Sequence, residues 1–383
     1  MKKILIIHNK YREVGGEDVA VKNEIDLLKT SYTVDTLIFE NEIKNHVFQF
    51  VYFLINRNLK SEKKLKKKLE EFNPDLVYIH NTWFKASLGI LKLLKNRKIK
   101  TIIKLHNFRY FCTRHWLKTN HLNNKPFCEA CGFEKNRTFI FNKYFSESAI
   151  KSIFMIIYGK LYFKYLKSGK FKILVLSNFH KNFLNGLGFD KEKVFVQRNY
   201  ITPDYKLINN DDKSSYILYA GRISKEKGVD ELVTAFLKSN NKNLNLKIVG
   251  EGPELEILKQ KFNDKKIEFL GKLQNNEVIE LIQKSKAVVT ATKLYEGQPT
   301  ILTEASILGK PAIFPNFGGM TEFFAENYPL KFEQFNYDDL VNKVNLLENN
   351  LNLNKLGNDN RKYINFLLDK EKILRSFNKF VDE

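Results

Sequence analysis

Two glutamates eight positions apart, Glu296 and Glu304, are the residues of this chain whose spacing says most about chemistry. An apolar run at 287–292 predicts a buried strand before them, and Pro299 between them predicts the first position of a helix, where no amide donor is needed. The helix N-terminus and the amides ahead of it favour an anion such as a phosphate. Carboxylates on both sides of a phosphate suit a ligand with hydroxyls on both flanks, as a nucleotide-sugar has.

A second segment adds positive charge. The short apolar run 216–220 is followed by a glycine-bounded loop that contains Arg222 and Lys227, and then by a helical pattern from 229. This order places both cations at the sheet edge where open α/β folds bind ligands. Arg222 can grip a diphosphate with its planar guanidinium, and Lys227 adds a point charge. Taken singly, each segment is also compatible with ordinary surface charge.

The N-terminal part offers a glycine turn and strand-end histidines. A buried strand is predicted at 3–9, and Gly15 and Gly16 form a turn into a helix, which lets a ligand approach the backbone closely. His80 and His106 each follow a later predicted strand, where such folds put working residues. We take His106 as the histidine that contacts the ligand and His80 as an alternative on the acceptor side.

Together these motifs resemble glycosyltransferase family 4, the retaining enzymes of the GT-B fold. The resemblance rests on Gly-Arg-x4-Lys-Gly, the Val-Gly-Glu-Gly-Pro turn at 249–253, Phe-Leu-Gly at 269–271 and Glu-x7-Glu, in this order over about 215–325. It extends more weakly to the N-terminus.

The resemblance implies transfer of a sugar from a nucleoside-diphosphate-sugar to an acceptor hydroxyl, with no cofactor or metal required. It implies that Glu296 binds sugar hydroxyls, Glu304 ribose hydroxyls, and His106 the sugar from the other domain. The expected catalytic residues are His106, Glu296, Arg222 and Lys227. The expected donor-binding residues are Gly15, Gly16, Gly221, Arg222, Lys227, Gly250, Gly252, Glu296, Gly297, Gln298, Pro299, Thr300 and Glu304.

Alternating strand and helix patterns predict an α/β protein with two doubly wound sheets. The GT-B resemblance makes these two Rossmann-like domains that face each other across a cleft. We expect an acceptor-binding domain at 1–198, a donor-binding domain at 199–360, and a C-terminal helix within 361–383 that crosses back to the first domain. The pattern places this last helix near 360–381.

Charge is divided unevenly along the chain. Residues 1–200 contain 38 Lys and Arg against 17 Asp and Glu, whereas residues 201–383 contain 26 of each. Such asymmetry predicts an anionic partner for the N-terminal half. The basic helix predicted at 57–68 and the lysine-and-aromatic segment 151–172 concentrate the charge and suit the anionic inner face of a membrane, although 151–172 is also compatible with an ordinary packed helix. No nucleic-acid-binding motif accompanies them.

No signal peptide and no transmembrane segment are apparent, so we expect a cytoplasmic protein that contacts the inner membrane surface peripherally. Cys112, Cys128 and Cys131 are candidates for a structural zinc site, with nearby histidines as further ligands. Relatives that this region resembles often have a fourth cysteine, which is absent here, and buried free thiols are the alternative.

The expected function is therefore a retaining glycosyltransferase whose acceptor is a glycan or lipid-linked glycan, such as an intermediate of lipopolysaccharide, capsule or exopolysaccharide. A nucleotide-sugar epimerase or phosphorylase of the same fold is compatible with the same motifs. A non-catalytic membrane or nucleic-acid adaptor would use only the basic half.

Overall fold

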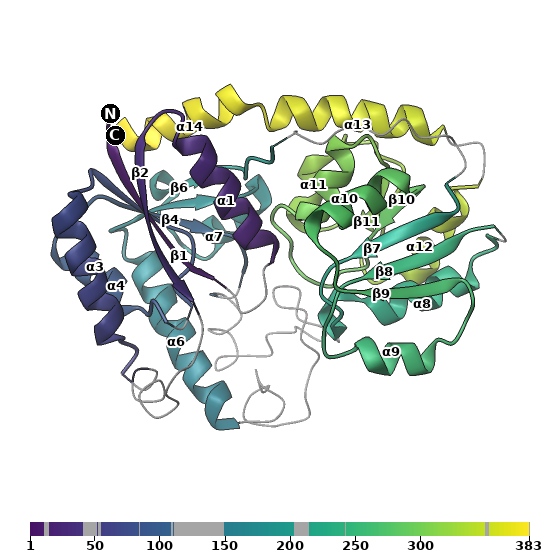
Figure 1. The fold of residues 1–383 in the computed structure, drawn as a ribbon, viewed down its shortest axis with the longest axis horizontal. Coiled ribbons are helices and arrows are strands. Elements are labelled where there is room, and N and C mark those ends of the chain that lie inside the picture. The colour runs from purple at the N-terminus through teal and green to yellow at the C-terminus, as the bar shows by residue number, and fades with distance from the viewer. Residues whose placement is uncertain are drawn as a thin grey trace. The chain divides into compact units, whose positions relative to one another are not determined.

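The computed structural model describes residues 1–10, 15–40, 52, 55–83, 85–108, 110, 149–202, 214–241, 243–348 and 352–382. These residues form two compact units (Figure 1). The first unit contains the described residues up to 201 and the segment from 369 to 382, and the second contains those from 202 to 368. The chain therefore leaves the first unit and returns to it.

The first unit is built on a six-stranded sheet of order β2-β1-β3-β4-β5-β6, in which every neighbouring pair is parallel. Its elements are β1 (Lys3–Lys10), α1 (Gly16–Leu28), β2 (Thr33–Glu40), α3 (Leu59–Phe72), β3 (Leu76–Ile79), α4 (Gly89–Asn96), β4 (Thr101–Leu105), α6 (Ala149–Lys167), β5 (Lys172–Val175), α7 (Asn178–Gly186), β6 (Val194–Val196) and α14 (Lys370–Asp382).

Alternate residues of these strands point to opposite faces. One face is apolar, and it forms a single core with the inner sides of α3, α4 and α6. Leu65 of α3, Leu94 of α4 and Leu166 of α6 are almost fully buried there. The core explains why β1, β3 and β4 read as apolar runs in the sequence, because strands covered on both faces carry few exposed positions.

The other face of this sheet is covered by α1 and α14. The α14 helix is attached through Phe380, whose ring packs at 4.9 Å from that of Phe195, and through Gln197, whose Nε2 donates to the Ile373 carbonyl at 3.1 Å. Tyr32, just after α1, donates its hydroxyl to Asn378 Oδ1 at 2.5 Å. The C-terminal segment is thus an integral layer of the first unit.

The second unit has a parallel sheet of order β12-β11-β10-β7-β8-β9. Its elements are β7 (Tyr216–Ala220), α8 (Val229–Lys238), β8 (Asn245–Val249), α9 (Leu255–Lys261), β9 (Ile267–Gly271), α10 (Asn275–Lys284), β10 (Ala287–Val289), α11 (Thr300–Ile307), β11 (Ala312–Pro315), β12 (Lys331–Phe332), α12 (Tyr337–Asn345) and α13 (Leu353–Leu367). The expected α/β class with two doubly wound sheets is confirmed.

Three sequence-based boundaries are wrong. The single helix expected near 360–381 is two helices, α13 and α14, because the Asp369 side chain accepts a hydrogen bond from the Lys372 amide at 2.9 Å and caps a new helix. Pro299 is the residue ahead of α11, with an extended ψ of 117°, and the helix begins at Thr300. The basic helix α3 begins at Leu59, because Asn58 caps it by accepting from the amides of Lys60 and Ser61.

The loops that leave β7 and β8 touch through their backbones, and this requires glycine. A Cβ on Gly250 would lie 1.8 Å from the Gly221 carbonyl oxygen, and one on Gly252 would lie 2.0 Å from that of Ile223. Between these loops the Ile223 amide donates to the Glu251 carbonyl at 2.8 Å. Gly228 is restricted in the same way, since its Cβ would lie 2.1 Å from the Ala291 carbonyl oxygen on the loop after β10.

Gly250→Ala is expected to lower the free energy of unfolding by about 2–4 kcal/mol, because the methyl group meets a carbonyl oxygen and the glycine φ is +138°. Gly186→Ala is the matched control, since no heavy atom lies within 4 Å of its Cβ position at the end of α7, and it should change stability by less than about 1 kcal/mol. Urea unfolding measures both. Equal midpoints for the two variants would contradict the packing argument.

Candidate functional site

The second sheet reverses its strand order between β7 and β10, so the loops after these two strands diverge from a common edge. In doubly wound sheets, ligands bind at this switch point. Lys227 lies in the loop after β7 and Glu296 in the loop after β10, and Lys227 Nζ is 2.6 Å from Glu296 Oε1. The structure therefore brings together two site residues that are 69 positions apart in the sequence.

The Lys227–Glu296 ion pair is partly open to solvent, with 28% of the lysine side chain and 21% of the glutamate side chain exposed. Thr292 Oγ1 also donates to Glu296 Oε1, at 3.3 Å. The Glu296 backbone is held by the Gly319 amide, which donates to its carbonyl at 2.9 Å. A carboxylate fixed in this way is ready to accept hydrogen bonds from hydroxyl groups without a loss of side-chain freedom.

The α11 helix begins directly after this loop. Its N-cap, Pro299, supplies no side-chain hydrogen bond, and no acidic residue stands in its first turn. The first amides of the helix and the positive end of its dipole therefore favour an anion at this end. Gly297 and Gln298 lie between the ion pair and the helix, and Gln298 is buried.

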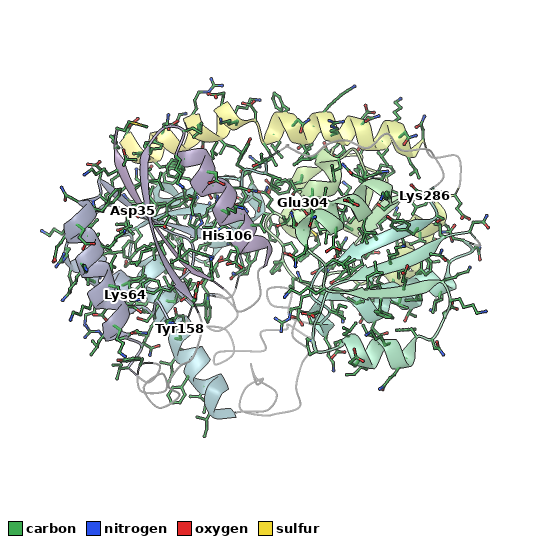
Figure 2. All side chains as sticks on the ribbon, in the orientation of Figure 1. Asp35, Lys64, His106, Tyr158, Lys286 and Glu304 are labelled. Atoms are coloured by element: carbon green, nitrogen blue, oxygen red, sulfur yellow. The ribbon has the colours of Figure 1, made fainter. Side chains whose placement is uncertain are left out.

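Glu304 lies in the middle of α11, on a helix whose other residues from Leu302 to Ile307 are also buried (Figure 2). Only 4% of Glu304 is exposed. Burial raises the pKa of this carboxyl group to about 7. Desolvation is the cause of this shift, so ionisation of Glu304 destabilises the folded protein, and a buried carboxyl group of this kind is a candidate for a functional position.

Arg222 is exposed in the loop after β7. Its backbone is fixed because the Tyr219 hydroxyl donates to the Arg222 carbonyl at 2.8 Å, and because the Gly221 amide donates to the Val249 carbonyl at 3.0 Å. The guanidinium can therefore reach an anion from a backbone that is held in place.

In the first unit, His8, His80 and His106 lie at the carboxyl ends of β1, β3 and β4. His8 Nε2 is 2.8 Å from Asp18 Oδ1, and Asp18 Oδ2 accepts from the Gly15 amide at 2.9 Å. Asp18 thus fixes the Gly15–Gly16 turn, in which Gly15 is the N-cap of α1 and Gly16 its first residue.

His80 and His106 are in direct contact. His80 Nδ1 and His106 Nε2 are 3.0 Å apart, and the two rings stack with centroids 5.3 Å apart. His80 is buried, whereas His106 at the end of β4 is partly exposed. Burial lowers the pKa of both imidazoles well below 6.5, and for His106 the positive charge of Lys104 lowers it further. Both rings are neutral at pH 7.

Several residues of the first unit went unnoticed in the sequence. Lys104 and Glu24 form a fully buried ion pair of 2.7 Å, and Asp18 supports the glycine turn. The sequence hint for this pair is Lys104 itself. It lies inside the apolar strand 101–105, and a lysine is almost never buried without an ionic partner. Of the predicted catalytic and donor-binding residues, Gly15, Gly16 and His106 lie in the first unit and the others in the second.

No group of three His, Cys, Asp or Glu side chains within the described residues is arranged to hold a metal ion. The zinc candidates Cys112, Cys128 and Cys131 lie outside the described residues. Among the helices of the described ranges, none has both the length and the hydropathy needed to cross a bilayer.

Comparison with known families bears directly on the second unit. Residues 204–363 match the family model of glycosyl transferases group 1. The second unit is therefore the part of the chain that is similar to group 1 glycosyl transferases. The expected family resemblance is confirmed at this level, and the two parallel sheets form a GT-B fold.

Relatives and solved structures agree with this assignment. An uncharacterized glycosyltransferase of Methanocaldococcus jannaschii is 25% identical over 100% of this chain and 98% of its own length. The amylovoran biosynthesis glycosyltransferase AmsD of Erwinia amylovora is 29% identical over 37% of this chain and 42% of its own.

Two solved structures share the fold over nearly the whole chain. The sucrose-phosphate synthase of Thermosynechococcus elongatus has a TM-score of 0.73 at 14% identity, with 99% of this chain and 98% of the other covered. Anabaena HepE, solved in complex with UDP and glucose, has a TM-score of 0.70 at 15% identity, with both chains fully covered.

Glu304→Gln is expected to stabilise the ligand-free protein by up to about 3 kcal/mol at pH 8, and by less than about 1 kcal/mol at pH 5. The unfolded chain ionises this carboxyl group near its ordinary pKa of 4.5, whereas the folded protein keeps it protonated until about pH 7. Stability therefore falls as the pH rises through this window, and glutamine removes the loss. Urea unfolding at both pH values tests this, with the exposed Glu280→Gln as control. An equal effect at pH 5 and pH 8 would contradict it.

Proposed function

We propose that this glycosyltransferase is a retaining enzyme of the family 4 type, which moves a sugar from a nucleoside-diphosphate-sugar to an acceptor hydroxyl. The observation that carries the proposal is the Lys227–Glu296 ion pair of 2.6 Å at the switch point, directly ahead of the α11 N-terminus. A cation, a fixed carboxylate and a helix N-terminus are the groups that a sugar diphosphate needs at one place.

The leaving diphosphate gains negative charge as the sugar departs. Arg222, Lys227 and the amides at the start of α11 stabilise that charge, and they are held in place before the reaction begins. Lys227 is already paired with Glu296, so it links the phosphate to the carboxylate that receives the sugar hydroxyls. We assign no enzymic nucleophile.

Glu304 is the proposed partner of the ribose hydroxyls, since two adjacent hydroxyls can donate to the two oxygens of one carboxylate. Hydrogen bonds to the ionised form compensate for the burial that otherwise keeps this group protonated near pH 7. Gly15, Gly16 and His106 of the first unit are proposed to contact the donor phosphates and the sugar. Neither a cofactor nor a metal takes part in this scheme.

The names of similar proteins support a choice of substrates to test. The complex of Anabaena HepE with UDP and glucose supports UDP-sugars as first donors. The amylovoran biosynthesis role in the name of the Erwinia protein supports a surface-polysaccharide intermediate, lipid-linked or free, as acceptor. The protein is proposed to meet this acceptor from the cytoplasm, at the anionic inner face of the plasma membrane.

The first unit has a surface suited to that membrane. One stripe of α6 exposes Ile150, Ile153 and Ile157, which recur at helical spacing, and continues with the exposed Lys160 and Lys164. Apolar side chains enter the boundary of the acyl chains, and lysines attract anionic headgroups. The α3 helix of the same unit adds exposed lysines such as Lys64 (Figure 2).

Arg222→Ala and Glu296→Ala are each expected to reduce sugar transfer at least 100-fold, because each removes a group that stabilises the transition state. The assay follows label from a UDP-sugar into a polysaccharide-precursor lipid fraction. Glu280→Ala and Lys238→Ala, on exposed positions of α10 and α8, serve as matched controls and should retain full activity.

The shift in Tm caused by UDP, GDP, ADP or dTDP, measured on the wild type and on these variants, identifies the nucleoside base of the donor. Wild-type turnover in the Arg222 and Glu296 variants would overturn the site. A free epimer or a sugar phosphate formed without acceptor would identify an epimerase or a phosphorylase. Lipid or polynucleotide binding with no nucleotide stabilisation would identify an adaptor.

Replacing Ile150, Ile153 and Ile157 together by serine is expected to weaken sedimentation with phosphatidylglycerol vesicles at least tenfold. The Lys160→Gln, Lys164→Gln double variant should lose roughly 30-fold, at about 1 kcal/mol per lysine. Leu237→Ser with Ile257→Ser, at exposed apolar positions of the second unit, is the control. Unchanged sedimentation of the α6 variants would remove α6 from the membrane contact.

A further inference from the structure

A column of polar residues occupies the sheet face beneath α1, where an apolar core is expected. Tyr78 of β3 donates its hydroxyl to Glu24 Oε1 at 2.8 Å, and Lys104 of β4 donates to Glu24 Oε2 at 2.7 Å. Tyr78 and Lys104 have no exposed surface, and Glu24 of α1 is 2% exposed. Each of the two carboxylate oxygens of Glu24 thus has a donor.

Stability alone does not explain this network. Removing two charges from water costs several kcal/mol per ion, and well-packed apolar side chains of similar volume often stabilise such a place equally well. The position of the network suggests a different role. Two residues further along the same strands and on the same face stand His80 and His106.

His80 is held from several sides. Its ring lies 4.4 Å from that of Tyr78 and packs edge-on to His8 at 6.4 Å. Its Nδ1 is 3.0 Å from His106 Nε2, and its own Nε2 is buried with no hydrogen-bond partner among the residues that the structure describes. Nδ1 of His80 therefore shares a hydrogen bond with His106, and Nε2 faces the protein interior.

Only one hydrogen can lie between the two histidines. Burial and the positive charge of Lys104 keep both rings neutral, so one ring donates and the other accepts. If His106 donated, His80 would carry its hydrogen on Nε2, as a buried N–H with no acceptor, which is rare in proteins. If His80 donates from Nδ1, its Nε2 is a bare lone pair and no hydrogen is stranded.

We propose that His80 is a positioning residue, which donates from Nδ1 to His106 Nε2 and so fixes the hydrogen of His106 on Nδ1. His106 then offers a hydrogen-bond donor at its remaining nitrogen and has no basic nitrogen free. Given the proposed function, His106 holds an oxygen of the transferred sugar and does not remove a proton from the acceptor. The Glu24–Lys104–Tyr78 network is the rigid support on which the two histidines lie.

The tautomer is measured directly by nitrogen NMR on the wild-type protein labelled with 15N-histidine, since a protonated and a bare imidazole nitrogen differ widely in chemical shift. His106 is assigned by the loss of its signals in His106→Gln. We expect Nδ1 protonated and Nε2 bare in His106 at pH 7. A hydrogen on His106 Nε2 overturns the proposal, whatever the activity of the protein.

Two substitutions of His80 separate positioning from packing. His80→Leu removes the donor, so the His106 signals should show a mixture of tautomers and kcat should fall about 10-fold to 100-fold with a smaller change in KM for the donor. His80→Asn places an amide at the position of Nδ1 and should restore the tautomer and most of kcat.

Loss of kcat in both variants with an unchanged His106 tautomer would overturn the positioning role. If the wild-type tautomer is as expected but no sugar is transferred, the proposed function fails and the hydrogen-bond assignment stands.

Discussion

Backbone contact between neighbouring loops is the constraint on which the second unit of this protein depends. At Gly228, Gly250 and Gly252 a single added carbon atom would collide with a carbonyl oxygen of the adjacent loop. Because these loops pack without side chains between them, the strand ends of the second sheet stay close together. Lys227 and Glu296 can then form an ion pair although they follow different strands. The chemistry of the site is thus set by positions that have no side chain.

The charged residues at the two candidate sites differ in their exposure to solvent. The second unit leaves Lys227, Glu296 and Arg222 partly or fully open to solvent, where they can exchange one partner for another. The first unit encloses Lys104 and Glu24 completely, where an exchange of partners would strand a charge. An open pair suits a ligand that must enter and leave. A closed pair suits a scaffold that keeps neighbouring imidazoles in one state.

Much of the fold could be predicted because buried parallel strands are locally apolar. The strands predicted at 3–9, 76–81 and 216–220 rest on this property, and the structure has strands there, with β3 ending at Ile79. The sequence does not reveal β2 (Thr33–Glu40) in this way. This strand lies at the sheet edge, is only partly buried and contains polar as well as apolar residues. The Lys104–Glu24 pair joins residues 80 positions apart, so no local pattern could reveal the partner. The same holds for the contact of His80 with His106.

The return of the chain to the first unit has a consequence for synthesis. α14 carries Phe377 and Phe380, which are buried against β3 and β6, and it follows the whole second unit in the sequence. On the ribosome, the first unit emerges early but lacks one layer until residues 369–382 have been made. The described residues of the second unit all lie between 202 and 368, so this unit can close before α14 has been made. The unit that is translated first is therefore the unit that is completed last. Its sheet face with the buried polar residues is fully covered only when α14 has been made.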